Sequence, residues 1–349
     1  MASDYLRSGE QTGGIRNLML FYNGHYENGA GVWKKGKFLP YVAYLNPEGE
    51  PLEWLFDGGL FLAKWSFARH GFEESHDPTD MRDWLWYLDK TFAPGGDLAE
   101  LNAAVAEAGE KLGDAGYRMK VVLMIPYPAP NQALFGELDG RMLCFDHAAA
   151  GPEEAQRNKR HALDWYVAEL ANRWRMAGFN RLRLSGLYWM NEAVRRDVPG
   201  EEELVRYAGE LVHNLQLRYF WIPYFRAEAF ESWAGYGFDA AVLQPNHFFS
   251  ETTDEGRIAE SAQLAKQAGM GVEVEVDFRI WEAGGKFRRK YLDYLNGGLK
   301  HGFDGDVFRG YYQDVDLMAA SAYSKDPARR EAYDWTYRFV KGKFERQDG

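Results

Sequence analysis

The sequence predicts a (β/α)8 TIM barrel, an α/β fold in which a single domain spans residues 1–349 with its core at about 15–340. Short β-like runs alternate with amphipathic helical stretches, and eight such strand-then-helix units can be counted. One run, residues 119–126, is almost continuously apolar, which is typical of a strand in a buried parallel sheet. Strands that alternate with helices pair in parallel through right-handed crossovers, and eight units favour closure into a barrel.

The elements follow one another in a regular order. The strands are expected at residues 15–22, 60–67, 119–126, 182–187, 219–223, 240–245, 271–278 and 306–312. The helices are expected at residues 80–92, 97–113, 153–176, 201–217, 227–235, 255–269, 286–302 and 328–340. A long irregular segment, residues 127–152, follows the third strand. The rival fold is a doubly wound open sheet, but neither a G-x-G-x-x-G after the first strand nor a P-loop is present.

Composition excludes several classes of protein. The chain is 46% hydrophobic and 27% charged, which is ordinary for a globular protein. Its net charge of -11 disfavours nucleic acid as a partner, because phosphate binding needs a basic surface. Aromatic residues make up 16% of the chain, and those outside the core can line a groove for sugar rings. Cys144 is the only cysteine, so no internal disulfide and no cysteine-based metal site can form.

Other features concern location and assembly. No apolar run of about 18 residues is present, so a membrane span is not expected. The start of the chain, Met1-Ala2-Ser3-Asp4-Tyr5, has neither the basic nor the apolar region of a signal peptide. The compartment therefore stays open: secreted or periplasmic if a signal peptide was removed, and otherwise cytoplasmic. We expect a monomer that needs no cofactor.

The first candidate site residue is Glu192, which follows the fourth strand. In TIM barrels the active site lies at the C-terminal ends of the strands. Glu192 comes directly after Asn191 and close to Tyr188 and Trp189. A carboxyl group among such neighbours has its pKa raised by desolvation, as a general acid near neutral pH requires. The alternative is that Glu192 caps the next helix or faces water.

The seventh strand supplies a second set of carboxylates. Because strand side chains alternate, Glu273, Glu275 and Asp277 share one face and the intervening valines share the other. A closed parallel barrel has no solvated edge, and buried carboxylates are costly unless paired or used. We expect Glu273 to lie deeper, where Arg183 or Lys64 can neutralise it, and Asp277 to lie in the following loop. Glu275 is therefore the favoured nucleophile.

Two carboxylates on opposite sides of a bond are what glycoside hydrolysis requires. An acid protonates the leaving oxygen, and a separation of about 5–5.5 Å between the two carboxyl groups, rather than roughly 6.5–9.5 Å, indicates a retaining mechanism.

Further strand-end residues are candidates for sugar binding: Asn191, Tyr127, Trp189, Tyr224, Asn246, His247, Asp277, Tyr312 and Glu273. Asp57, beside the second strand, is another polar residue near a strand end. No H-E-x-x-H or similar metal motif is present. A sugar-binding barrel without catalysis and a metal- or phosphate-dependent barrel enzyme are the alternatives.

These motifs also carry a resemblance. Asn191-Glu192 after strand four, with a glutamate on strand seven, resembles the clan of retaining (β/α)8 glycosidases. That resemblance implies that Asn191 bonds the 2-substituent of the sugar. Residues 56–62, 186–192 and 271–277 further resemble a bacterial family catalogued as domain of unknown function 4855, and the similarity spans about residues 15–340. It implies a carbohydrate-active barrel without indicating a substrate.

Overall fold

Eight parallel strands close into a barrel in the computed structural model, which describes residues 4–347. Of the five residues on which the signal-peptide expectation rests, Met1, Ala2 and Ser3 lie outside the described residues. The barrel strands are β1 (Asn17–Tyr22), β4 (Gly58–Leu62), β5 (Met119–Ile125), β8 (Leu182–Trp189), β9 (Arg218–Trp221), β10 (Ala240–Leu243), β11 (Gly271–Glu275) and β12 (Arg309–Tyr312). The predicted (β/α)8 fold is confirmed.

Strand β1 closes the barrel. It pairs in parallel with β4 on one side, where Leu18 lies opposite Gly58, and with β12 on the other, where Leu18 lies opposite Gly310. The remaining strands follow in the order β12-β11-β10-β9-β8-β5-β4. All eight strands therefore end at the same mouth of the barrel.

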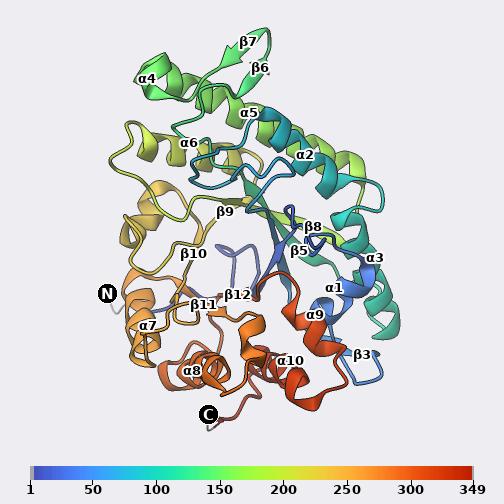
Figure 1. Ribbon diagram of the computed structural model, residues 1–349. Coiled ribbons are helices and arrows are strands. Elements are labelled where there is room, and N and C mark those ends of the chain that lie inside the picture. The colour runs from blue at the N-terminus through green and yellow to red at the C-terminus, as the bar shows by residue number, and fades with distance from the viewer. Residues whose placement is uncertain (1–3, 348–349) are drawn as a thin grey trace.

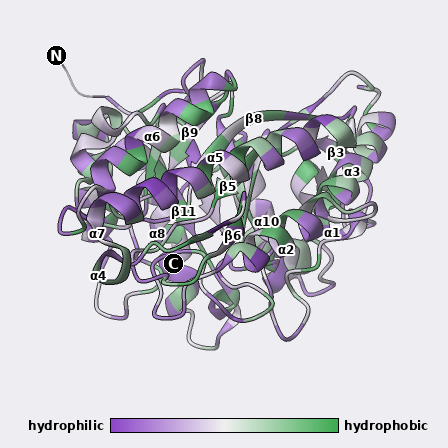
Figure 2. Cartoon of the chain, turned by 90° about the horizontal axis from the view of Figure 1, so that it is seen from above, coloured by the Kyte–Doolittle hydropathy of each residue, from purple (hydrophilic) through white to green (hydrophobic). Residues whose placement is uncertain are grey.

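Helices surround the strands, as Figure 1 shows. The longer ones are α2 (Met81–Phe92), α3 (Asp97–Lys111), α5 (Pro152–Ala177), α6 (Glu201–Asn214), α7 (Gly256–Ala268), α8 (Lys286–His301) and α10 (Pro327–Val340). Shorter helices are α1 (Lys35–Val42), α4 (His147–Ala150) and α9 (Leu317–Ala322), and two are 3-10 turns, η1 (Phe230–Tyr236) and η2 (Phe278–Trp281). Hydrophilic and hydrophobic residues alternate along α5 and α6 (Figure 2), as expected for helices with one face on a barrel.

Local sequence explains where several elements begin and end. Asp80 caps α2, because its side chain accepts hydrogen bonds from the backbone N–H groups of Arg82 and Asp83, and Asp83 bonds back to the Asp80 N–H. Gly178, in a left-handed conformation with φ of 59°, ends α5. On β11, Val272 and Val274 are buried on the opposite face from the glutamates, so this strand has the expected alternation.

Some elements differ from the sequence expectation. The second barrel strand is residues 58–62 and not 60–67, because the chain turns at residues 63–72 and carries the bridge Trp65–Gly71. Where an α-helix was expected at residues 227–235, the chain forms the 3-10 helix η1 at Phe230–Tyr236. Two hairpins, β2 (Ala43–Leu45) with β3 (Pro51–Trp54) and β6 (Gly136–Leu138) with β7 (Arg141–Leu143), were not predicted. Their strands have only three or four residues, too few to show an alternation of apolar and polar residues.

Among residues 4–347, no helix has the length and apolar character needed to cross a membrane.

Asp57 ties the N-terminal end of the barrel together. Its carboxylate accepts hydrogen bonds from the backbone N–H groups of Arg16 at 3.0 Å and Asn17 at 2.8 Å, and Lys120 Nζ lies 3.5 Å away. Because Asp57 precedes β4, it lies at the opposite end from the mouth. Asp57 therefore holds the N-terminal ends of the strands together and is not part of the mouth.

We predict that Asp57→Ala lowers the free energy of unfolding by about 2–3 kcal/mol, because two backbone N–H groups lose a charged acceptor. Urea unfolding followed by circular dichroism measures the change. Glu48→Ala, at an exposed loop position, is the matched control and should change stability little. Equal stability of the two variants would contradict the role assigned to Asp57.

Candidate active site

Two cavities meet at Glu192 at the C-terminal mouth of the barrel. The inner cavity, of about 370 Å3, is lined by Leu20, Tyr22, Tyr26, Lys64, Tyr188, Glu192, Ile222, Gln244, Asn246, Phe249, Glu273, Tyr312 and Asp314. The outer cavity, of about 320 Å3, is lined by Glu73, Glu74, Asn191, Glu192, Ala193, Arg195, Tyr224 and Glu228. A carboxyl group that is common to both cavities can act on a bond that passes from one to the other.

Glu192 is partly buried in the loop that follows β8. Burial raises the pKa of its carboxyl group to about 7, and the nearby Glu73 carboxylate adds to the rise. Contact with the Gln244 side chain and the charge of Lys64 act in the opposite direction without cancelling the effect of burial. Glu192 can therefore hold a proton at neutral pH and also release it.

Glu273 points into the inner cavity from the middle of β11 and is 2% exposed. Burial, together with the neighbouring carboxyl groups of Glu275 and Glu192, raises its pKa well above the usual range. Its Oε1 atom has no hydrogen-bond partner among residues 4–347. The expected neutralisation by Arg183 or Lys64 is wrong: Arg183 is exposed, and Lys64 instead pairs with Glu73 at 3.1 Å.

Glu275, the last residue of β11, is fully buried and held by hydrogen bonds. Its Oε2 accepts one from the Tyr294 hydroxyl, and its Oε1 accepts one from the Asn246 backbone N–H at 3.1 Å. The Tyr294 hydroxyl in turn accepts the backbone N–H of His247 at 3.0 Å. Burial raises the pKa of Glu275 to about 7, although the hydrogen bonds from Tyr294 and Asn246 favour the charged form.

One wall of the inner cavity is aromatic. Tyr22 and Tyr312 make an edge-to-face contact with ring centroids 5.5 Å apart, and Phe249 extends the wall at 5.2 Å from Tyr312. Two residues that line the same cavity, Asn246 and Asp314, have left-handed backbones with φ of 51° and 59°. Such conformations cost free energy in residues other than glycine and occur preferentially at functional sites.

Several predicted ligands do line the cavities. Tyr312, Asn246 and Glu273 line the inner one, and Asn191 and Tyr224 line the outer one. Asn191 is fixed in place, because its Nδ2 donates to the Ala193 carbonyl at 3.0 Å and its backbone carbonyl accepts from Trp221 Nε1 at 2.8 Å.

Four other predicted ligands lie elsewhere. Tyr127 is buried and donates to Glu201 at 3.2 Å, and Trp189 packs edge-to-face against it with centroids 5.8 Å apart. His247 is buried with its ring nitrogens 2.9 Å from Asp293 and 3.0 Å from Thr253. Asp277 caps η2 and forms an ion pair with Arg279 at 2.6 Å. None of these four side chains lines either of the two cavities.

Two further residues of the site, Tyr188 and Tyr294, were not among the residues predicted to bind or react with the ligand. Tyr188 precedes Glu192 by four residues and points inward from β8, a position that strand alternation alone could have indicated. Tyr294 reaches Glu275 from the middle of helix α8, where an aromatic residue is typical of ordinary core packing. No local feature of the sequence indicates that Tyr294 belongs to the site.

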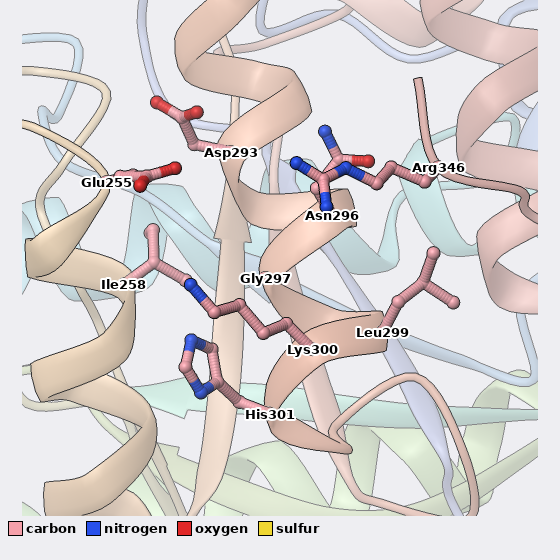
Figure 3. A pocket seen from close by; sticks show the side chains of 9 residues that line it. All are labelled: Glu255, Ile258, Asp293, Asn296, Gly297, Leu299, Lys300, His301 and Arg346. Carbon is pink, nitrogen blue, oxygen red and sulfur yellow. The ribbon is translucent and has the colours of Figure 1, made fainter. Parts of the chain in front are cut away.

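A further cavity lies in the outer layer of helices, away from the mouth. Figure 3 shows its lining along α8, with Glu255 and Ile258 from the start of α7 and Arg346 from the C-terminal segment. Its volume of about 370 Å3 equals that of the inner cavity. It contains no strand-end carboxylates, so the mouth is the better candidate site.

No group of three or more histidine, cysteine or carboxylate side chains within residues 4–347 is arranged to hold a metal ion.

The fold and the carboxylates at its mouth define a barrel of the type found in many enzymes. The chain belongs to the family described as domain of unknown function DUF4855, whose profile matches residues 17–338. No curated protein matches the sequence.

Solved structures resemble the chain in fold at low identity. A Bacteroidetes-affiliated GH5 cellulase is 11% identical, with a TM-score of 0.48 over 97% of this chain and 93% of that one. A psychrophilic family 10 endo-β-1,4-xylanase is 13% identical, with a TM-score of 0.46 over 93% and 99%. A D-psicose 3-epimerase from Clostridium cellulolyticum H10 is 10% identical, with a TM-score of 0.40 over 95% and 100%. Similarities at this level carry no inference about the reaction, which has to rest on the site itself.

We predict that the stability effect of Glu192→Gln depends on pH. The folded-state pKa of about 7 exceeds the ordinary value of 4.5, so the Glu192 carboxyl group favours folding most below pH 4.5. This contribution is lost as the pH rises from 4.5 to 7. Glutamine does not ionise, and the variant should therefore gain stability relative to the parent protein over that window.

Urea unfolding at pH 5 and pH 8 measures this change. Glu110→Gln, at an exposed position on α3, should show no comparable difference between the two pH values. If the stability difference between Glu192→Gln and the parent is the same at both, the raised pKa of Glu192 is contradicted.

Proposed function

We propose that the protein is a glycoside hydrolase that cleaves an O-glycosidic bond in an oligo- or polysaccharide, with two carboxyl groups and a retaining mechanism. The observation that carries the proposal is Glu192, which borders both cavities and has a pKa of about 7. The aromatic wall of Tyr22, Tyr312 and Phe249 supports a sugar as the ligand.

In this proposal Glu192 is the general acid and base. Its proton goes to the glycosidic oxygen as the bond to the leaving group breaks, and the leaving group occupies the outer cavity. The charged Glu192 then takes a proton from water in the second step. A group with a pKa near the working pH serves both steps, because each protonation state is well populated.

Glu275 is the proposed nucleophile, and its neighbour Glu273 is the rival. Glu275 is nearer the mouth, and donors from Tyr294 and Asn246 stabilise its negative charge. Glu273 lines the cavity, but it has no donor at Oε1 and its pKa is raised well above the usual range. A neutral carboxyl group is a poor nucleophile, which favours Glu275.

One observation favours a second candidate function, the binding of sugar without cleavage. Glu275 is 0% exposed, and both of its oxygen atoms accept hydrogen bonds from the protein. Attack on a sugar requires that one oxygen be freed. A barrel in which this does not happen would bind the ligand and leave it intact.

A panel of polysaccharides, followed by assay of new reducing ends, tests the proposal. On a substrate that is cleaved, Glu192→Gln should lower kcat by about 10²–10⁴-fold, the usual contribution of general acid–base catalysis. Glu48→Gln, on an exposed loop, should behave like the parent protein. Proton NMR of the first product should show the same anomer as the substrate. An inverted anomer would contradict the retaining mechanism, and unchanged turnover by Glu192→Gln would exclude its role.

Removal of each β11 carboxylate identifies the nucleophile. Glu275→Ala should lose nearly all turnover and regain part of it in azide, which replaces the missing nucleophile and leaves as a glycosyl azide. Glu273→Gln should still turn over, because it keeps a neutral polar group at the same place. The reverse pattern would assign the nucleophile to Glu273. Sugar binding with no cleavage by any protein in the set would favour the second candidate.

A further inference from the structure

The inner cavity is lined by one buried polar atom that the described part of the protein leaves without a hydrogen-bond partner. Oε1 of Glu273 is buried and has no hydrogen bond within residues 4–347. Around it lie Tyr22, Tyr188 and Tyr312, each close enough for the charge of Glu273 to affect its pKa. All three side chains line the cavity together with Glu273.

Unpartnered polar groups at this depth are unusual. Buried polar atoms are nearly always hydrogen-bonded, since an orphaned group costs about 1–3 kcal/mol. Here the buried orphan is Oε1 of Glu273, and three tyrosine side chains line the same cavity beside it. A ligand rich in hydroxyl groups suits this lining, because each sugar hydroxyl can both donate and accept a hydrogen bond.

The charges around the cavity limit which sugar can bind. Its acidic lining residues are Glu192, Glu273 and Asp314, and Lys64 is its one basic lining residue among those described. Lys64 already pairs with Glu73 at 3.1 Å. A sugar that carries its own carboxylate would therefore meet carboxyl groups and find no free cation, which is unfavourable in a buried site.

We propose that Glu273 is a sugar-binding residue, whose carboxyl group acts with the hydroxyl groups of Tyr22, Tyr188 and Tyr312 to bind an uncharged sugar unit and to exclude a uronic acid. The inference rests on the proposed function in taking the ligand of this cavity to be a sugar. It adds which residue binds the sugar and states that the bound sugar is uncharged. In this role Glu273 is a hydrogen-bond donor in its protonated form and does not attack the substrate.

Direct binding tests the proposal without requiring turnover. Saturation-transfer NMR with the full chain uses glucose, galactose, mannose and xylose as neutral probes, and glucuronate and galacturonate as charged probes. We expect at least one neutral sugar to bind and neither uronate to bind as well. Glu273→Leu should weaken that binding by about tenfold, the equivalent of one buried hydrogen bond. Glu273→Gln, which keeps a neutral donor, should retain most of it.

Two further variants separate binding from folding. Tyr312→Phe removes only a hydroxyl group from the cavity and should also weaken the binding of the neutral sugar. Tyr207→Phe, whose hydroxyl bonds to Asp164 in the outer helices, is the matched control and should not. Thermal unfolding of each variant shows whether it is folded.

The outcomes of this test are distinct from those for hydrolysis. The inference is overturned if no neutral sugar binds, if a uronate binds at least as well, or if Glu273→Leu binds like the parent protein. It is also overturned if Glu273→Gln abolishes turnover while sugar still binds, since Glu273 would then be the nucleophile. Neutral sugar binding that depends on Glu273, without cleavage of any polysaccharide, would support this inference while rejecting the proposed reaction.

Discussion

Closure of the sheet through β1 is the constraint on which the remaining structure depends. Because β1 pairs with both β4 and β12, no strand of the barrel is left with a free edge, and both faces of every strand are covered. Parallel pairing then brings residues that are far apart in the chain to one mouth. Glu192 follows β8 and Glu275 ends β11, with β9 and β10 between these two strands in the barrel.

The same enclosure sets the electrostatics of the mouth. Glu192, Glu273 and Glu275 all have raised pKa values, with burial as the largest cause in each case. Neighbouring carboxyl groups disfavour one another's charged forms, and the charges of Glu275 and Glu192 add to the effect of burial on the pKa of Glu273. The hydrogen bonds decide how the charge is divided. Glu275 has donors at both oxygen atoms, whereas Glu273 lacks one at Oε1.

The sequence predicts the fold and the location of the site well, but not the direction of each side chain. The position of Glu192 follows from counting strands, and the alternation on β11 follows from its valines. His247 and Tyr127 come just after strands, yet both are buried against outer helices, because a chain that leaves a strand no longer keeps the two-residue period. Tyr294 reaches the site from α8 through a tertiary contact that no local pattern records.

The two cavities at Glu192 are built from different parts of the fold. The inner one is lined partly from the barrel strands, by Tyr22, Tyr188 and Tyr312 among others, whereas the outer one is lined by loops alone, which carry Glu74, Arg195 and Glu228. Loops accept substitutions and insertions that a packed strand does not. Substitutions can therefore reshape the outer side of Glu192 more freely than the strand-borne part of the inner side, and the two sides can evolve, or be engineered, separately.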